Sequence, residues 1–394
     1  MRILHINHPR DITRIMQDIK VDPYGIRIMS PKATTYLLKL NSISNICANI
    51  LKQEMLSLGA DAAVARGALT GAVKKTDCLL MGNLAQFAGL SRKLNKQPFG
   101  LNAISENITK AIRNYGADNL TLGLKSQNLR LGRRTLIMGV VNATPDSFSG
   151  DGITSVSEAV DLAQKLAKDG ADIIDVGGES SRPGARPVPL EEELKRTIPL
   201  IKALTKSLLI PVSIDTCKPE VARQALDNGA AMINDISGMR EARMAKIAAK
   251  YKAAVVLMHM KGNPRTMQND PSYTSLMDEV LQYLQEAIDR ALEAGIDRER
   301  IVIDPGIGFG KTVRDNLNIL NNLNEFKILG RPILIGTSRK SFIGRIINAG
   351  PRECIYATVS SSVLAAHNGA HIVRTHDVRE VSQALKILDA ANRQ

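Results

Sequence analysis

The sequence of 394 residues contains no tryptophan, only 3% aromatic residues and just four cysteines. The cysteines are scattered along the chain at positions 47, 78, 217 and 354, without the spacing of metal ligands. This usage argues against a disulfide framework and against a cysteine metal site. It predicts reduced thiols and a cytoplasmic protein.

The sequence also lacks any apolar run of membrane-spanning length, and charged residues interrupt the segment from Met1 to Lys20. Neither a transmembrane helix nor the apolar core of a secretory signal is therefore expected. A hydrophobic content of 44% is ordinary for a globular protein. The length exceeds what one compact core usually accommodates, so two domains are expected.

Acidic residues are scarce in the first third of the chain. Residues 1–134 contain 20 Lys and Arg against 8 Asp and Glu, a net charge of +12, whereas the remainder has 32 against 31. A basic module can bind nucleic acid or an acidic partner, or can simply present a solvated surface. Because no zinc-finger, helix-turn-helix or aromatic stacking signature accompanies the charge, nucleic-acid binding is the weaker alternative.

We interpret residues 1–124 as a basic α+β N-terminal domain, residues 125–134 as a linker and residues 135–394 as a second domain. In the first domain the patterns predict a strand at Met1–Asn7 and a long helix at Ala33–Leu58 that ends at Gly59. No catalytic constellation is readable there, and the role of this domain stays open.

From Leu136 onward, short apolar runs alternate with helical patterns. The expected strands begin at Leu136, Ile173, Val212, Ala231, Val255, Ile301, Ile333 and Ile372. Eight strands, each followed by a helical segment, predict a (β/α)8 TIM barrel. The competing architecture is a doubly wound sheet, but its glycine-rich phosphate loop after the first strand is missing.

Polar residues follow the expected strands, where a TIM barrel places its active site. They are Asn142, Asp175, Asp215, Asn234, His259, Asp304, Thr337 with Lys340, and Arg374 with His376. Each one taken singly has an ordinary structural explanation, since an Asp after a strand often caps the next helix. Together they predict one convergent pocket, in which carboxylates and a carboxamide suit a flat heterocycle with amino and ring N–H groups. The cationic residues suit phosphate oxygens.

Several segments together resemble the dihydropteroate synthases in order and spacing. They read LIMGVVNATPDSFSGDG, ADIIDVGGESSRPGA, PVSIDTCKPEVA, INDISG, VIDPGIGFGK, GTSRKSFIG and VRTHDV. The resemblance covers about two-thirds of the chain, from Leu136 to the C-terminus, and the N-terminal third inherits no function from it.

The resemblance implies condensation of 6-hydroxymethyl-7,8-dihydropterin diphosphate with p-aminobenzoate to give 7,8-dihydropteroate and diphosphate. It assigns the pterin to Asp215, Asn234, Asp304 and Lys340. It assigns the diphosphate to Asn142, Ser181, Arg374 and His376, with Asn142 beside a Mg2+ ion. It assigns p-aminobenzoate to Phe148, Pro183, Phe309 and Ser338, again with Lys340. Lys340, Asp146, Arg182 and Asp304 are the expected catalytic residues, and the resemblance also implies a homodimer.

Three positions depart from the family pattern. Ser181 stands where threonine is usual, Cys217 replaces a serine, and Ile307 replaces a frequent phenylalanine. The first two changes are chemically mild. Ile307 is expected to loosen the aminobenzoate pocket, because an aliphatic side chain stacks less well than an aromatic one.

Two other functions are compatible with a pterin-binding barrel. A corrinoid-dependent methyltransferase shares the barrel and the pterin-binding carboxylates, but it does not need Arg374 and His376 for a diphosphate. A non-catalytic pterin-binding paralogue would be expected to have lost loop residues such as Asp146 and Arg182, which are present here.

Overall fold

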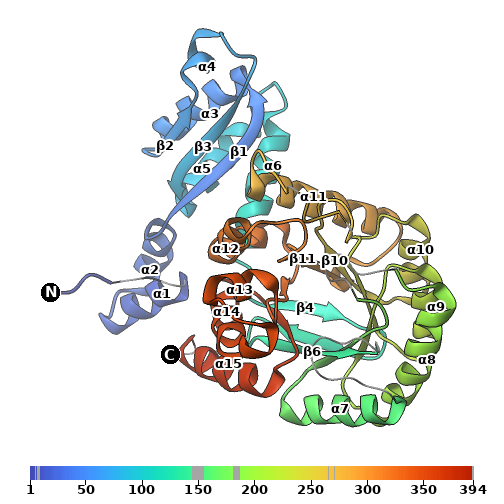
Figure 1. The fold of residues 1–394 in the computed structure, drawn as a ribbon. Coiled ribbons are helices and arrows are strands. Elements are labelled where there is room, and N and C mark those ends of the chain that lie inside the picture. The colour runs from blue at the N-terminus through green and yellow to red at the C-terminus, as the bar shows by residue number, and fades with distance from the viewer. Residues whose placement is uncertain are drawn as a thin grey trace. The chain divides into compact units, whose positions relative to one another are not determined.

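The structure, a computed structural model, describes residues 1–4, 6, 9–143, 155–180, 187–264, 266–269 and 271–392. The chain divides into two compact units, residues 1–113 and residues 114–394. Figure 1 shows the smaller unit in blue to cyan, and the larger one as a ring of helices around a central sheet whose colours run on through green and yellow to red. In the described part of the chain, no helix is both long and apolar enough to cross a membrane.

The N-terminal unit is α+β, as predicted. Its antiparallel sheet has the order β1-β3-β2, from Thr35–Ser44, Lys75–Asn83 and Asp61–Val64. Its helices are α1 (Pro9–Asp18), α2 (Pro23–Met29), α3 (Asn45–Ser57), α4 (Arg66–Thr70), α5 (Leu84–Leu94) and α6 (Leu101–Tyr115), whose last residues fall in the second unit. One core cluster joins sheet and helices, with Leu51, Leu80 and Phe87 at its centre.

The predicted helix at Ala33–Leu58 is wrong in its first half. Residues Thr35–Ser44 form β1, and the helix α3 begins only at Asn45, where the Ser44 side chain accepts the Cys47 N–H. Alternate residues of β1 face the core, a period of two that the apolar spacing at Leu37 and Leu38 obscures. The expected strand at Met1–Asn7 does not form in the described residues of that segment.

The second unit is a barrel of eight parallel strands, which confirms the predicted fold. In chain order the strands are β6 (Leu136–Asn142), β7 (Ile173–Gly177), β8 (Val212–Asp215), β9 (Met232–Asp235), β10 (Ala254–Met258), β11 (Ile301–Asp304), β12 (Leu334–Ile335) and β13 (Ile372–Thr375). Neighbours pair in parallel, with β13 beside β6. A parallel bridge between Ile303 and Ile333 closes the ring.

Helices alternate with these strands and cover the outside of the barrel (Figure 1). They are α7 (Val156–Asp169), α8 (Leu190–Ser207), α9 (Pro219–Asp227), α10 (Ala242–Tyr251), α11 (Leu276–Glu293), α12 (Val313–Asn321), α13 (Ser341–Ile347), α14 (Ile355–His367) and α15 (Val378–Asn392). The strands are apolar on both faces because one face packs on these helices and the other fills the barrel. Each connection after a strand therefore starts from the same rim.

A short hairpin, β4 (Leu120–Gly123) and β5 (Asn128–Leu131), fills the opposite end of the barrel. Its side chains Leu122, Leu124 and Leu131 are buried with the inward-facing residues of the strands. Gly132 follows with a φ of 95°, and a Cβ there would lie 1.5 Å from the Asp118 carbonyl oxygen. The segment expected as a linker, residues 125–134, thus includes one strand of this hairpin, and the division between units lies earlier, at residue 113.

Candidate active site at the rim of the barrel

The rim at the carboxyl ends of the strands brings together most of the predicted site residues. Nine of them fall in the described parts of the chain: Asn142, Asp215, Asn234, Asp304, Phe309, Ser338, Lys340, Arg374 and His376. The others lie outside the described residues: Asp146, Phe148, Ser181, Arg182 and Pro183. The described residues form three adjoining groups.

The first group is a charged cluster centred on Arg374 of β13. Its Nε donates to Asp175 Oδ2 at 2.7 Å, and its Nη2 donates to Asp215 Oδ2 at 2.8 Å. Asn234 of β9 also donates to Asp175 Oδ2, at 2.9 Å. Asp175 is fully buried, and its Oδ1 has no hydrogen-bond partner among the described residues. The sequence placed Asp175 at a strand end but gave no sign that it anchors Arg374.

Burial controls the protonation of these carboxyl groups. It raises the pKa of Asp215 to about 7, and the positive charge of Arg374 opposes this rise. Burial also raises the pKa of Asp304, against the Gly306 N–H and Lys340. Burial by itself would lower the pKa of Arg374, but Asp175 and Asp215 outweigh it and raise that pKa. The cluster therefore offers carboxylate acceptors whose charge depends on a nearby cation.

The second group joins the first and last strands of the barrel. Asn142 Nδ2 lies 3.3 Å from His376 Nε2, and His376 Nδ1 lies 3.0 Å from Ser338 Oγ. With the Asn142 amide donating, the imidazole carries its hydrogen on Nδ1 and donates to Ser338. Arg339 is held by Asp377 instead, with Nη2 2.7 Å from Oδ1. An amide, an imidazole and a hydroxyl therefore meet at one point of the rim.

The third group is aromatic and cationic. Lys340 Nζ lies 4.0 Å from the centroid of the Phe309 ring, a cation–π distance. Phe309 is buried in a small cluster with Ile236, Met258, Met260 and Met267. Ile307 packs instead in the main core between strands and helices. The expected effect of Ile307 on the aminobenzoate pocket stays a prediction.

The glycine-rich segment that contains Phe309 is hydrogen-bonded to a buried lysine. Lys311 Nζ contacts His259 Nδ1 at 2.8 Å and the carbonyl oxygens of Gly306 and Phe309 at 2.9 and 3.1 Å. Burial lowers the pKa of His259 to about 2, and that of Lys311 to about 7, where Asp304 opposes it. His259 therefore supports this loop as a neutral imidazole. Sequence reasoning missed Lys311, because nothing in the motif marks its side chain as buried.

A second ion network lies behind the rim, between β8 and α8. Lys218 donates to both Glu179 and Glu193, and Thr216 Oγ1 donates to Glu193 at 2.6 Å. Burial alone would lower the pKa of Lys218, but its hydrogen bonds to the two glutamates raise it. The network links the loop that follows Asp215 to the first turn of α8.

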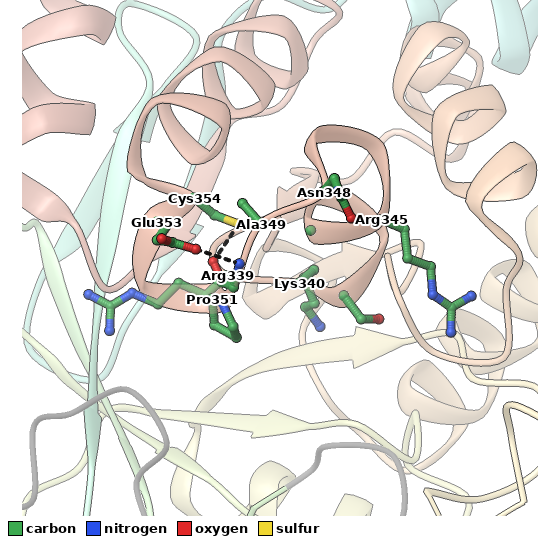
Figure 2. A pocket seen from close by; sticks show the side chains of 11 residues that line it. Arg339, Lys340, Arg345, Asn348, Ala349, Pro351, Glu353 and Cys354 are labelled. Carbon is green, nitrogen blue, oxygen red and sulfur yellow. Dashed lines mark hydrogen bonds between the residues drawn. The ribbon is translucent and has the colours of Figure 1, made fainter.

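A hollow of about 470 Å3 borders the third group (Figure 2). Its lining comes from the β12–α13 connection, from α13 and from the turn before α14, and includes Lys340, Arg345, Asn348 and Glu353. Figure 2 shows the Lys340 and Arg345 side chains extending from neighbouring turns. Lys340 thus stands between this hollow and the ring of Phe309.

Comparisons with known proteins agree with this geometry. A family model described as pterin binding enzyme matches residues 138–376. A dihydropteroate synthase of Synechocystis sp. is 49% identical over 262 residues, which are 66% of this chain and 91% of that protein. The solved structure of Xanthomonas albilineans dihydropteroate synthase with 4-aminobenzoic acid has a TM-score of 0.66 at 42% identity, and the match covers 70% of this chain and 99% of that one.

Some relatives also match the N-terminal unit. A probable bifunctional folylpolyglutamate synthase/dihydropteroate synthase of Halobacterium salinarum is 38% identical over 382 residues. The match covers 96% of this chain and 46% of that protein. The basic N-terminal unit therefore has a counterpart in a larger protein.

Proposed function

The chain belongs to the pterin-binding enzyme family as a dihydropteroate synthase. We propose which residues at its barrel rim bind each substrate and the departing diphosphate. The enzyme condenses 6-hydroxymethyl-7,8-dihydropterin diphosphate with p-aminobenzoate, and releases 7,8-dihydropteroate and diphosphate. The reaction needs no protein nucleophile, because the aromatic amine attacks the pterin methylene as diphosphate leaves. Since the relatives are synthases, the methyltransferase alternative is set aside.

The pterin lies in the charged cluster. Asp215 and Asp304 accept from the amino and ring N–H groups of the heterocycle, and Asn234 can both donate and accept. The observation that carries this proposal is the pair of hydrogen bonds from Arg374 to Asp175 and Asp215. They hold Asp215 in place and favour its ionised form, which the pterin N–H groups require.

The p-aminobenzoate lies beside Phe309 and Lys340. The Phe309 ring offers a flat apolar face, and the Lys340 ammonium can donate to the pterin and contact the benzoate at once. Ser338 borders the same space. Phe148, Pro183, Asp146 and Arg182 would complete the site from segments outside the described residues, in the roles that family resemblance assigns to them.

The diphosphate binds between the Asn142–His376 pair and Arg374, with Ser181 in the role that family resemblance assigns to it. In the described ranges no three Asp, Glu, His or Cys side chains converge as a metal site. Mg2+ usually takes one or two protein oxygens and several from substrate phosphates, so the single amide oxygen of Asn142 fits that requirement. When bound, Mg2+ would neutralise charge on the departing diphosphate. Asn142 and His376 orient the leaving group, and Arg374 faces it with a fixed positive charge.

We also propose a cytoplasmic homodimer formed through α14 and α15. These two helices pack together, and exposed apolar side chains on them include Tyr356 and Ile387, at 84% and 74% exposure. The four free cysteines suit a reducing compartment. Sedimentation equilibrium of the purified chain tests the dimer, and Tyr356→Glu with Ile387→Glu should yield monomers.

Turnover by the purified protein is the test of the whole proposal. With pterin diphosphate, p-aminobenzoate and Mg2+, it should form dihydropteroate. Asp215→Asn should raise the KM for the pterin substrate, because an amide presents an N–H where the ligand also presents one. Arg345→Ala, which changes an exposed side chain in the neighbouring hollow, is the control. Equal pterin KM values for wild type and Asp215→Asn would remove Asp215 from the site.

A further inference from the structure

The segment Gly306–Gly310 is unusual in how it is held. It connects β11 to α12, and its three glycines all have left-handed φ angles, from 64° to 81°. A Cβ on Gly306 would lie 1.9 Å from the His259 carbonyl oxygen, so the backbone approach requires glycine. A segment this rich in glycine has many conformations available, and something other than its own sequence must select one.

Three side chains from two neighbouring elements bind the backbone of this segment. Asn316 of α12 accepts the Gly308 N–H at 2.7 Å. Gln268 donates to the Gly308 carbonyl at 2.9 Å, and the Tyr273 hydroxyl donates to the Gly310 carbonyl at 2.7 Å. Gln268 and Tyr273 both lie in the connection between β10 and α11.

Lys311 makes the largest number of these contacts. An ammonium group has three N–H donors, and three acceptors surround Lys311 Nζ: His259 Nδ1 and the carbonyl oxygens of Gly306 and Phe309. The lysine is 2% exposed, and all three acceptors around its Nζ are protein atoms. The Gly306 carbonyl also accepts the Phe309 N–H at 3.1 Å, so one of the two carbonyls belongs to Phe309 and the other is hydrogen-bonded to its N–H.

We propose that Lys311 is a positioning residue for the aminobenzoate site, which it shapes by fixing the backbone on both sides of Phe309. This proposal rests on the assignment of p-aminobenzoate to Phe309 and Lys340. The neutral His259 imidazole holds the Lys311 ammonium in place. His259 itself follows β10, where its backbone N–H donates to the Asp304 carbonyl. Among the pterin acceptors, Asp215 and Asn234 lie on other strands. Asp304 ends β11, but its Oδ1 accepts the Gly306 N–H rather than a Lys311 donor. Loss of Lys311 should therefore affect the p-aminobenzoate site more strongly than the pterin site.

The test is steady-state kinetics of Lys311→Met in the full chain, with both substrates varied. Methionine keeps the apolar length of the side chain and removes its three donors. We expect the KM for p-aminobenzoate to rise at least tenfold, while kcat and the KM for the pterin diphosphate change less than threefold. A merely structural role would lower kcat and the thermal midpoint without this selectivity.

Lys327→Met is the matched control, because Lys327 is another largely buried lysine, packed over Tyr115 in the segment before β12, and so away from the rim. It should leave both KM values unchanged. If Lys311→Met does not fold, the double variant Gln268→Met with Tyr273→Phe tests the same loop by removing two other hydrogen bonds to its backbone. We then expect the KM for p-aminobenzoate to rise at least threefold.

Phe309→Ala distinguishes failure of the Lys311 positioning role from failure of the aminobenzoate assignment. If it raises the p-aminobenzoate KM and Lys311→Met does not, the positioning role is overturned while the site stands. If Phe309→Ala itself leaves that KM unchanged, the assignment of the aminobenzoate site fails, and the positioning role fails with it.

Discussion

Arg374 donates a hydrogen bond from Nε to the buried Asp175 Oδ2, at 2.7 Å. The same guanidinium donates to Asp215 Oδ2 at 2.8 Å, so one cation holds two carboxylates. Asp175 is fully buried and Arg374 is mostly so. A buried charge that loses its partner is expensive, and this sharing makes Arg374 essential to the cluster even before any diphosphate binds.

Arg374→Met should therefore cost stability as well as turnover. It leaves Asp175 and Asp215 without their cation, and we expect the free energy of unfolding to fall by about 3–5 kcal/mol. Adding Asp175→Asn removes one of the orphaned charges and should restore a large part of that loss without restoring turnover. Urea unfolding of the three proteins checks this, and an unstable double variant would contradict the charge argument.

Pterin affinity should depend on pH through Asp215. Its pKa in the free protein is about 7, and only the ionised form accepts the pterin N–H groups. Affinity at pH 6 should thus be about tenfold weaker than at pH 8, since about a tenth of the groups are ionised at pH 6. Calorimetric titration measures this directly. Asp215→Asn should show a flat profile.

The same shift has a signature in the stability of the free protein. The folded-state pKa of Asp215 lies above the unfolded value of about 3.9. Its contribution to stability is thus complete below about pH 4 and is lost as the pH rises through about 7. Asp215→Asn removes that dependence, which a comparison of urea midpoints at pH 5 and pH 8 detects.

The barrel was predictable because its local signals agree with its tertiary structure. Each strand is a short apolar run that ends in a polar residue, as at Asn142 and Asp304, and period and length separate such runs from the helices between them. The N-terminal unit gave a weaker signal. In Thr35–Ser44 the apolar residues fit a helical spacing as well as the alternation of a strand. Antiparallel pairing with β3 stabilises the strand.

The candidate site was predictable in its residue types but not in its connections. Asp215, Asn234 and Arg374 were expected from the motifs. That Asp175 holds Arg374, or that Lys311 is buried on His259, depends on contacts between residues at least 50 positions apart. Sequence periodicity carries no information on such pairs.

The hairpin β4–β5 should be required by the barrel, whereas residues 1–113 should be separable from it. A chain that starts at Asn114 should fold and keep synthase activity, as in relatives that lack most of the N-terminal unit.

A chain that starts at Arg133 loses Leu122, Leu124 and Leu131, which fill the end of the barrel opposite the rim. At about 1.5–3 kcal/mol for each of the three buried leucines, it should lose about 4.5–9 kcal/mol of stability. Activity and thermal midpoints of the two chains test this, and an inactive but folded chain from Asn114 would show that the N-terminal unit contributes to the site.

Lys218 should stabilise the fold by neutralising Glu193, which is 1% exposed. Among the described residues, Lys218→Met leaves this carboxylate with Thr216 as its remaining side-chain donor, and we expect the free energy of unfolding to fall by about 3 kcal/mol. Glu193→Gln in the same chain should recover part of it. Lys202→Met, at an exposed position of α8, is the control and should be within about 0.5 kcal/mol of wild type. Equal losses from Lys202→Met and Lys218→Met would show that burial of Glu193 is not the cause.

Lys340 should matter most to the chemical step. Its ammonium faces the Phe309 ring at 4.0 Å, and its positive charge lowers the pKa of Asp304 against the effect of burial. Lys340→Ala should raise both KM values and cut kcat/KM at least 100-fold, about 3 kcal/mol of transition-state stabilisation. Arg345→Ala removes a cation from the same hollow without touching Phe309, and should leave turnover near wild type. Steady-state kinetics and a thermal midpoint for each variant distinguish lost chemistry from lost folding, and wild-type kinetics in a folded Lys340→Ala protein would remove Lys340 from the site.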